Sequence, residues 1–124
     1  MTIRIAHSLD ALAPWKDQWD ALAAAQGLPM LYYAWFLAAE RHLAEPGSVR
    51  VVYVLNAEAS LCAACALELR HDNRGRRSYQ ILGMPRLYEP SALLYRDPAA
   101  HNALIKALAG LDHPVVLARV WPDA

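Results

Sequence analysis

Two neighbouring segments of this chain are apolar on both faces of an extended strand, and no other feature restricts its fold as strongly. Residues 49–55 read VRVVYVL and residues 61–69 read LCAACALEL, so nearly every alternating position carries an apolar side chain. A strand that is apolar on both faces is buried on both, which requires a central place in a sheet. The sequence therefore predicts a layered domain built around these two strands.

The length and composition of the chain fit one such domain. Its 124 residues have room for one core, so residues 1–124 are expected to form a single domain. Hydrophobic residues make up 56% and charged residues 19%, which excludes disorder. Lys plus Arg equals Asp plus Glu at 12 each, so the zero formal charge gives no basis for binding nucleic acid or an anionic membrane.

Two features of the sequence, its apolar runs and its N-terminus, predict where in the cell the protein is found. The longest apolar run, residues 30–39, is shorter than the ~20 residues that a membrane span needs. The N-terminus also lacks the basic and apolar pattern of a signal peptide. We therefore expect a soluble, cytoplasmic protein without a membrane span.

Hydrophobic spacing and capping residues predict the remaining elements. Further strands are expected over residues 2–6, 78–83 and 115–121, with a short apolar piece at 92–95. Three helices are expected: one from Ser8 or Asp10 to about Gln26, one over 31–43, and one from Pro98 to Gly110. Pro14 fits only the first turn of the first helix, and Gly27 fits its end. Asp97 is the expected N-cap of the third helix. The helix over 31–43 is apolar almost all round in its first half, so it should be buried on two sides or meet a partner.

The connections between these elements predict the fold class. Polar turns at 56–60 and 71–77 join three strands into an antiparallel meander. The third helix then connects to the last strand, which favours a right-handed parallel crossover. The expected fold is α/β, with a mixed sheet and helices on both of its faces.

The two cysteines, Cys62 and Cys65, form a C-x-x-C sequence, which can indicate redox or zinc chemistry. Redox motifs lie between a strand and a helix N-terminus, whereas this pair lies inside a predicted strand. Residues three apart in a strand point to opposite faces, so these thiols should neither bridge nor share a metal. We interpret them as two small core residues.

Four arginines gather at the turn before the fourth strand, namely Arg70, Arg74, Arg76 and Arg77. Such a cluster either holds a phosphate or solvates a hairpin tip, and the second is favoured because single-sign clusters are commonly solubilising surface. The five histidines show no metal-ligand spacing, so no metal site is expected. His101 is the best acid or base candidate among them, although its helical spacing from leucines favours a core or boundary histidine.

The predicted order is a strand, two helices, a three-stranded meander, a helix and a parallel strand, which is the order of the first two-thirds of the GNAT acyltransferase fold. The phrases WKDQWDALAAAQGLPMLYYAWFLAAERHL, VRVVYVLNAEASLCAACALEL and YQILGMPRLYEPSALLYRDPAAHNALIKAL resemble the N-terminal half of the CelD-like GNAT proteins associated with bacterial polysaccharide synthesis. The resemblance covers about residues 12–120 and consists of apolar and aromatic positions. It implies a GNAT-like fold that is incomplete relative to a full one.

The resemblance also implies acyl-CoA, or acetyl-CoA, as the family's acyl donor. In that family a Gly-rich turn and the N–H groups of the helix after it bind the pyrophosphate. The corresponding stretch here, RDPAAHNAL, has no glycine, and Pro98 offers no N–H. Asp97 also places a negative charge where the phosphates would lie. We therefore expect no cofactor site in this segment.

Three residues beside that helix start are the candidates for binding a substrate, namely Tyr88, Glu89 and Tyr95. They flank a loop at the open carboxyl ends of the strands, where α/β sheets place their ligands. The sequence indicates no catalytic residue, because it has no G-x-S-x-G and no recognisable triad.

The resemblance implies a non-catalytic half that packs on a catalytic GNAT-like half and shapes an acceptor pocket for acyl transfer. Whether this chain is itself an enzyme stays open. The alternative is a stand-alone binding or interaction module with a degenerate GNAT fold. An acetyltransferase completed by homodimerisation is disfavoured, because dimerisation does not restore the missing phosphate turn. The expected partner is a C-terminal GNAT-like half or a second copy of the chain, since the strand at 115–121 is apolar on both faces.

Overall fold

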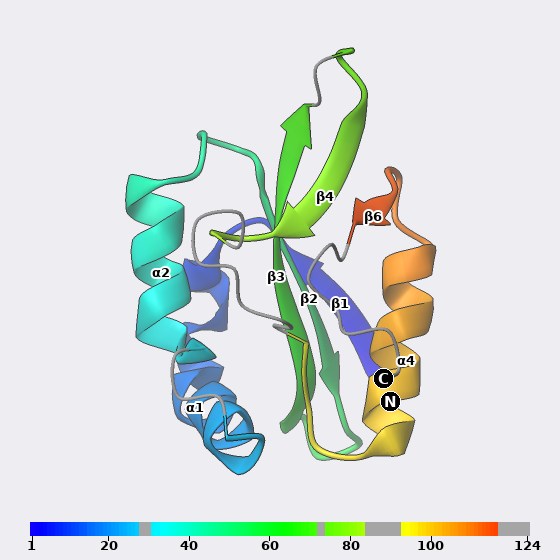
Figure 1. The fold of residues 1–124 in the computed structure, drawn as a ribbon. Helices are drawn as coiled ribbons and strands as arrows, with labels where there is room; N and C mark the ends of the chain where they lie inside the picture. Colours follow the sequence, from blue (N-terminus) through cyan, green and yellow to red (C-terminus); the bar gives the residue numbers. More distant parts are fainter. Residues whose placement is uncertain (28–30, 72–73, 84–92, 117–124) are drawn as a thin grey trace.

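One mixed β-sheet with helices on both faces forms the protein in the computed structural model, which describes residues 1–27, 31–71, 74–83 and 93–116. Figure 1 shows α1 (Lys16–Ala25) and α2 (Tyr33–His42) on one face of the sheet and α4 (Pro98–Ala109) on the other. This arrangement confirms the predicted α/β class and the cover on both faces.

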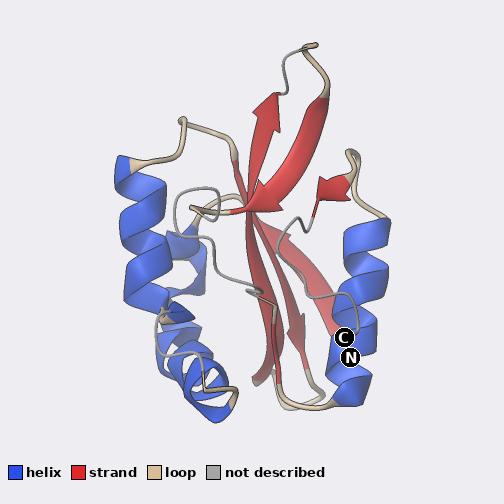
Figure 2. Ribbon diagram, in the orientation of Figure 1, coloured by secondary structure: helices blue, strands red, loops and turns tan. Residues whose placement is uncertain are grey.

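The sheet runs in the order β1-β2-β3-β4-β6, and β5 pairs with β3 off this path. Its strands are β1 (Thr2–Ala6), β2 (Val49–Leu55), β3 (Leu61–His71), β4 (Arg77–Ile81), β5 (Leu94–Tyr95) and β6 (Val115–Val116). The pairs within β1 to β4 and the β3 to β5 pair are antiparallel, which confirms the meander. The pair of β4 with β6 is parallel, as predicted, and Figure 2 shows β6 as the short strand that follows the helix α4. The predicted right-handedness of the crossover stays a prediction.

The two apolar segments form the centre of the sheet, as predicted. All of β2 except Arg50 is buried, as are the first eight residues of β3. The prediction that successive side chains of this segment point to opposite faces of the sheet is wrong at the start of β3. Val54 pairs with Ala63, but Leu55 pairs with Leu61, so Cys62 is the extra residue of a β-bulge.

The first predicted helix is divided into two parts. Its start at Ser8 is confirmed, because the Ser8 Oγ accepts a hydrogen bond from the Asp10 N–H at 3.1 Å. Residues Leu9–Trp15, however, form a 3-10 helix, η1, and the α-helix begins only at Lys16. Pro14 explains the correction, because it lacks the N–H of an α-helical bond and its ring clashes with the preceding turn.

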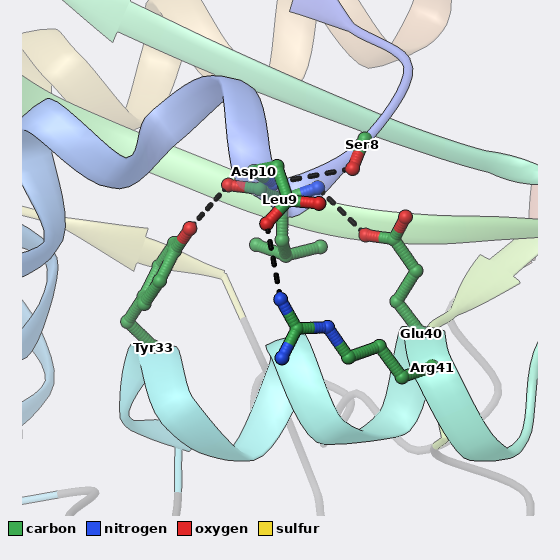
Figure 3. Close-up of polar contacts among 6 residues, drawn as sticks. All are labelled: Ser8, Leu9, Asp10, Tyr33, Glu40 and Arg41. Carbon is green, nitrogen blue, oxygen red and sulfur yellow. Dashed lines mark hydrogen bonds and ion pairs between the residues drawn. The ribbon is translucent and has the colours of Figure 1, made fainter.

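Polar contacts join α2 to η1, as Figure 3 shows. The Leu9 N–H donates to Glu40 Oε1 at 2.7 Å, and the Tyr33 hydroxyl donates to the Leu9 carbonyl. The exposed pair of Arg41 and Asp10 adds an ion pair at 3.3 Å. These bonds pair both the N–H and the carbonyl of Leu9, and they hold η1, which leads into α1, against α2.

The helix predicted over 31–43 is α2, and it buries one face rather than two. Tyr33, Phe36 and Ala39 are buried, and the Phe36 ring packs edge-on against Trp19 with centroids 5.6 Å apart. Tyr32, the N-cap residue of α2, is exposed.

Part of the last predicted strand lies outside the described residues. Val115 and Val116 form β6 opposite Tyr79 and Gln80, whereas residues 117–121 of the prediction fall in the range that is not described. Within the described residues, no helix is long and apolar enough to cross a membrane.

Candidate functional site

A cavity of about 510 Å³ lies between α1, the start of β3 and the junction of β5 with α4. Its apolar lining comes from Ala21, Leu22, Ala25 and Leu61, and its polar lining comes from Gln18, Gln26, Ser60, Tyr95 and Arg96. An apolar hollow with a few polar groups is the usual form of a small-molecule site. The volume also falls in the range of such sites, roughly 300–1,000 Å³.

Two glutamines line this cavity, Gln18 within α1 and Gln26 at its C-cap. Gln26 Oε1 accepts a hydrogen bond from the Tyr95 N–H at 2.6 Å, and its Nε2 donates to the Leu93 carbonyl at 3.1 Å. Gln18 Oε1 accepts from the Leu61 N–H at 2.7 Å. Sequence reasoning missed both side chains, although one signal was present. Each glutamine lies four residues from Leu22, so all three share one helix face.

Tyr95 lines the cavity and is held from two sides. Its backbone is bound to Gln26, and its ring lies 4.4 Å from the His101 ring between centroids, tilted by 51°. His101 is therefore a boundary residue of α4 that packs on an aromatic ring. The other two predicted substrate residues, Tyr88 and Glu89, lie outside the described residues. A substrate role for all three stays a prediction.

The start of α4 beside the cavity is closed by its own cap. Asp97 Oδ1 accepts a hydrogen bond from the Ala100 N–H at 2.9 Å, and Pro98 occupies the first turn without an N–H. The other oxygen, Oδ2, lies 3.5 Å from Arg96 Nε. This confirms Asp97 as the N-cap and places a carboxylate, already paired, where an anion would otherwise approach the helix.

A second polar cluster lies in a cavity of about 350 Å³ between β1, β4 and the end of α4. The buried Tyr79 hydroxyl donates to Asp112 Oδ1 at 2.8 Å. That bond, aided by His113 and Arg50, lowers the pKa of Asp112, while burial raises the pKa of Tyr79. No sequence pattern indicates this cluster, because its members come from β2, β4 and the connection between α4 and β6.

Both cysteines are free and buried within β3, which confirms them as core residues. Burial raises the pKa of the Cys65 thiol far above its ordinary value, so it is neutral and poorly nucleophilic. Among the residues that the structure describes, no group of three or more His, Cys, Asp or Glu side chains is placed to hold a metal ion.

Comparison with protein-family models gave no match, and comparison with curated proteins gave none either. Solved structures do match. An aminoglycoside acetyltransferase from an uncultured soil metagenomic sample is 16% identical with a TM-score of 0.56, over 88% of this chain and 70% of that one. A probable acetyltransferase is 14% identical with a TM-score of 0.54, over 94% and 78%.

A third similar structure is a ribosomal-protein-alanine N-acetyltransferase from Brucella melitensis biovar Abortus 2308. It is 13% identical with a TM-score of 0.50, over 99% of this chain and 84% of that one. Identities this low show the fold alone. The chain thus has the fold of GNAT-type acetyltransferases, as the sequence resemblance predicted.

Proposed function

We propose that this chain acts in acyl transfer as the acceptor-binding part of a GNAT-type acyltransferase of the CelD-like kind, in the cytoplasm of a bacterium. The observation that carries the proposal is the cavity of about 510 Å³ at Tyr95, on a fold shared with acetyltransferases. Acyl transfer needs an acceptor held beside the donor, and this cavity opens next to the helix start that binds the donor in the family.

The lining of the cavity supports a binding role over a catalytic one. Deprotonating an acceptor requires a general base within hydrogen-bond reach. The described residues that line the cavity include no carboxylate and no histidine. Because Asp97 and Pro98 also close the helix start, we propose that a second, GNAT-like half binds the acyl-CoA and supplies the base.

Isothermal titration of acetyl-CoA into the full chain tests this division of roles. We expect no saturable heat at micromolar concentrations, because the helix start offers a carboxylate and a proline in place of free N–H groups. Saturable micromolar binding would mean that the chain holds the donor itself, and it would contradict this division of roles.

The alternative is a stand-alone interaction module with a degenerate GNAT fold, and one observation favours it. Ile3 and Ile5 on the edge strand β1 remain 45% and 48% exposed. Exposed apolar side chains on an unpaired edge invite another chain to pair there. If Ile5→Lys abolishes binding of a partner protein at the β1 edge, and the cavity binds no small molecule, the alternative replaces our proposal.

A further inference from the structure

We propose that the cavity between α1 and the β5–α4 junction binds a small apolar carboxylate, with Arg96 as the residue that binds the carboxylate group. The inference deepens the proposed function, on which it rests for the role of this ligand as the acyl acceptor. It names the acceptor's chemical class, which is an aliphatic or aromatic body that is held by a carboxylate and also carries a hydroxyl. In the transfer the hydroxyl oxygen bonds to the acyl carbon, its proton goes to the base of the second half, and the CoA thiol leaves.

The charge of the lining points to an anion. Arg96 is the one charged side chain among the described residues that line the cavity. The nearest carboxylate, Asp97, is already engaged twice, by the Ala100 N–H at 2.9 Å and by Arg96 Nε at 3.5 Å. An amine ligand would therefore meet a guanidinium and no free carboxylate, so cations are disfavoured.

The guanidinium of Arg96 has donors left for a ligand. Only its Nε is paired with Asp97, and within the described residues its Nη groups have no protein partner. The side chain is 51% exposed, so a ligand reaches it without a rearrangement of the protein. Two parallel N–H groups of one guanidinium match the two oxygens of a carboxylate, which makes arginine the preferred partner of this group.

The remainder of the lining selects an apolar body. Ala21, Leu22 and Ala25 lie on one side of α1, and Leu61 faces them from the start of β3. The alanines keep the hollow open, because larger side chains at these positions would fill it. Apolar surface removed from water contributes roughly 25 cal/mol per Å², so a ligand of six to eight carbon atoms gains from entering.

Titration of the full chain with hexanoate, hexylamine and hexanol tests the proposal, because the three probes share one body and differ in charge. We expect saturable binding of hexanoate, weaker binding of hexanol and none of hexylamine, measured by chemical-shift changes at the amides of Ala21 and Leu22. Arg96→Gln should weaken hexanoate binding about tenfold, the loss of one charged hydrogen-bond pair, and leave hexanol unchanged.

Arg41→Gln is the matched control. Arg41 is similarly exposed, at 59%, and is likewise paired with an aspartate, Asp10, at 3.3 Å, but it does not line the cavity. This variant should bind hexanoate as the unmodified chain does. Ala21→Leu should weaken binding of hexanoate and hexanol alike by filling the hollow, which locates the site.

Three outcomes would overturn the proposal: no binding of hexanoate, equal binding of hexanoate and hexylamine, or equal effects of Arg96→Gln and Arg41→Gln. Failure of the proposed function looks different. Saturable binding of acetyl-CoA would overturn the division between donor and acceptor halves, while the preference of the cavity for hexanoate would stand or fall separately.

Discussion

At the scale of single residues, side chains complete backbone hydrogen bonding that the sheet leaves unmade. The strand β5 has only two residues, so its own ladder with β3 is short. Gln26 provides both an acceptor and a donor to it, at the Tyr95 N–H and the Leu93 carbonyl. Together with the pairing to β3 and the contact with His101, this one side chain holds Tyr95, and with it one wall of the cavity, in place.

Replacing Gln26 tests this role. Gln26→Ala removes both hydrogen bonds from partly buried backbone groups, and we expect a loss of about 2 kcal/mol in the free energy of unfolding, measured by urea denaturation. Gln26→Glu keeps the acceptor for the Tyr95 N–H and should lose less. An alanine variant as stable as the unmodified chain would show that β5 is held by other contacts.

Asp97 makes a comparable local contribution at the start of α4. Asp97→Ala removes the carboxylate that accepts from the Ala100 N–H and should cost about 1 kcal/mol of stability. Asp97→Asn retains a capping oxygen and serves as the control, with a smaller loss. The thermal unfolding midpoints of the two variants and the unmodified chain measure these losses. Equal midpoints for all three proteins would contradict the capping role of Asp97.

Among the glycines, Gly83 has a steric requirement as well as a conformational one. Its φ of +76° is left-handed, and an added Cβ would lie 2.5 Å from the Trp35 ring. We expect Gly83→Ala to lower the free energy of unfolding by more than the ~1 kcal/mol that left-handed strain alone costs. Gly75→Ala, with φ +78° and nothing within 4 Å of the added Cβ, is the control and should show the conformational cost alone.

At the scale of elements, those with local signals could be predicted and those decided by tertiary contacts could not. The start of α4 followed from Asp97 and Pro98, because caps act within one turn. The bulge at Cys62 has no local signal, since it depends on how β3 pairs with β2. For the candidate site, the loop position indicated Tyr95, whereas Arg96 was missed because only the fold brings it to a cavity whose other wall is α1.

The Tyr79–Asp112 bond links β4 to the connection between α4 and β6, and it makes stability depend on pH. The pKa of Asp112 is lower in the folded chain than in the unfolded one, mainly because of the Tyr79 hydrogen bond. The contribution of this bond to folding stability is therefore fully present above the ordinary aspartate pKa of about 3.9. It is lost as the pH falls through the lower pKa that Asp112 has in the folded chain.

Tyr79→Phe should remove this part of the acid sensitivity. Urea unfolding between pH 3 and pH 6 is expected to show a shallower fall in stability for the variant than for the unmodified chain. Tyr33→Phe also removes a buried tyrosine hydroxyl bond, but to a backbone carbonyl, so it controls for general destabilisation. Parallel pH curves for all three proteins would show that the bond does not shift the titration of Asp112.

At the scale of the whole molecule, apolar side chains are exposed at both edges of the sheet that the structure describes. The sheet has two edges in the described part of the chain, β1 and β6. Ile3 and Ile5 on β1 and Val116 on β6 are each more than 40% exposed. The sequence predicted the apolar character of the last strand, but the exposure of β1 depends on α4 packing mainly over the central strands β2 and β3.

These exposed edges lead to a prediction of self-association. The predicted contact involves the strand at 115–121, with Trp121 outside the described residues, and the helix α2, where Tyr32 is exposed. Pairing of a second chain along an apolar edge strand buries surface that otherwise meets water. We expect light scattering to give a mass above 13.8 kDa that rises with concentration.

Substitutions at the two edges distinguish which of them associates. Val116→Lys places a charge on the β6 edge and should return the protein to a monomer, because burying an unpaired ammonium in an interface is costly. Ile5→Lys places the same charge on β1 and should leave the association unchanged. If Ile5→Lys alone gives the monomer, the contact lies at β1. If the unmodified chain is a 13.8 kDa monomer at every concentration, the exposed valine and isoleucines do not suffice to drive pairing.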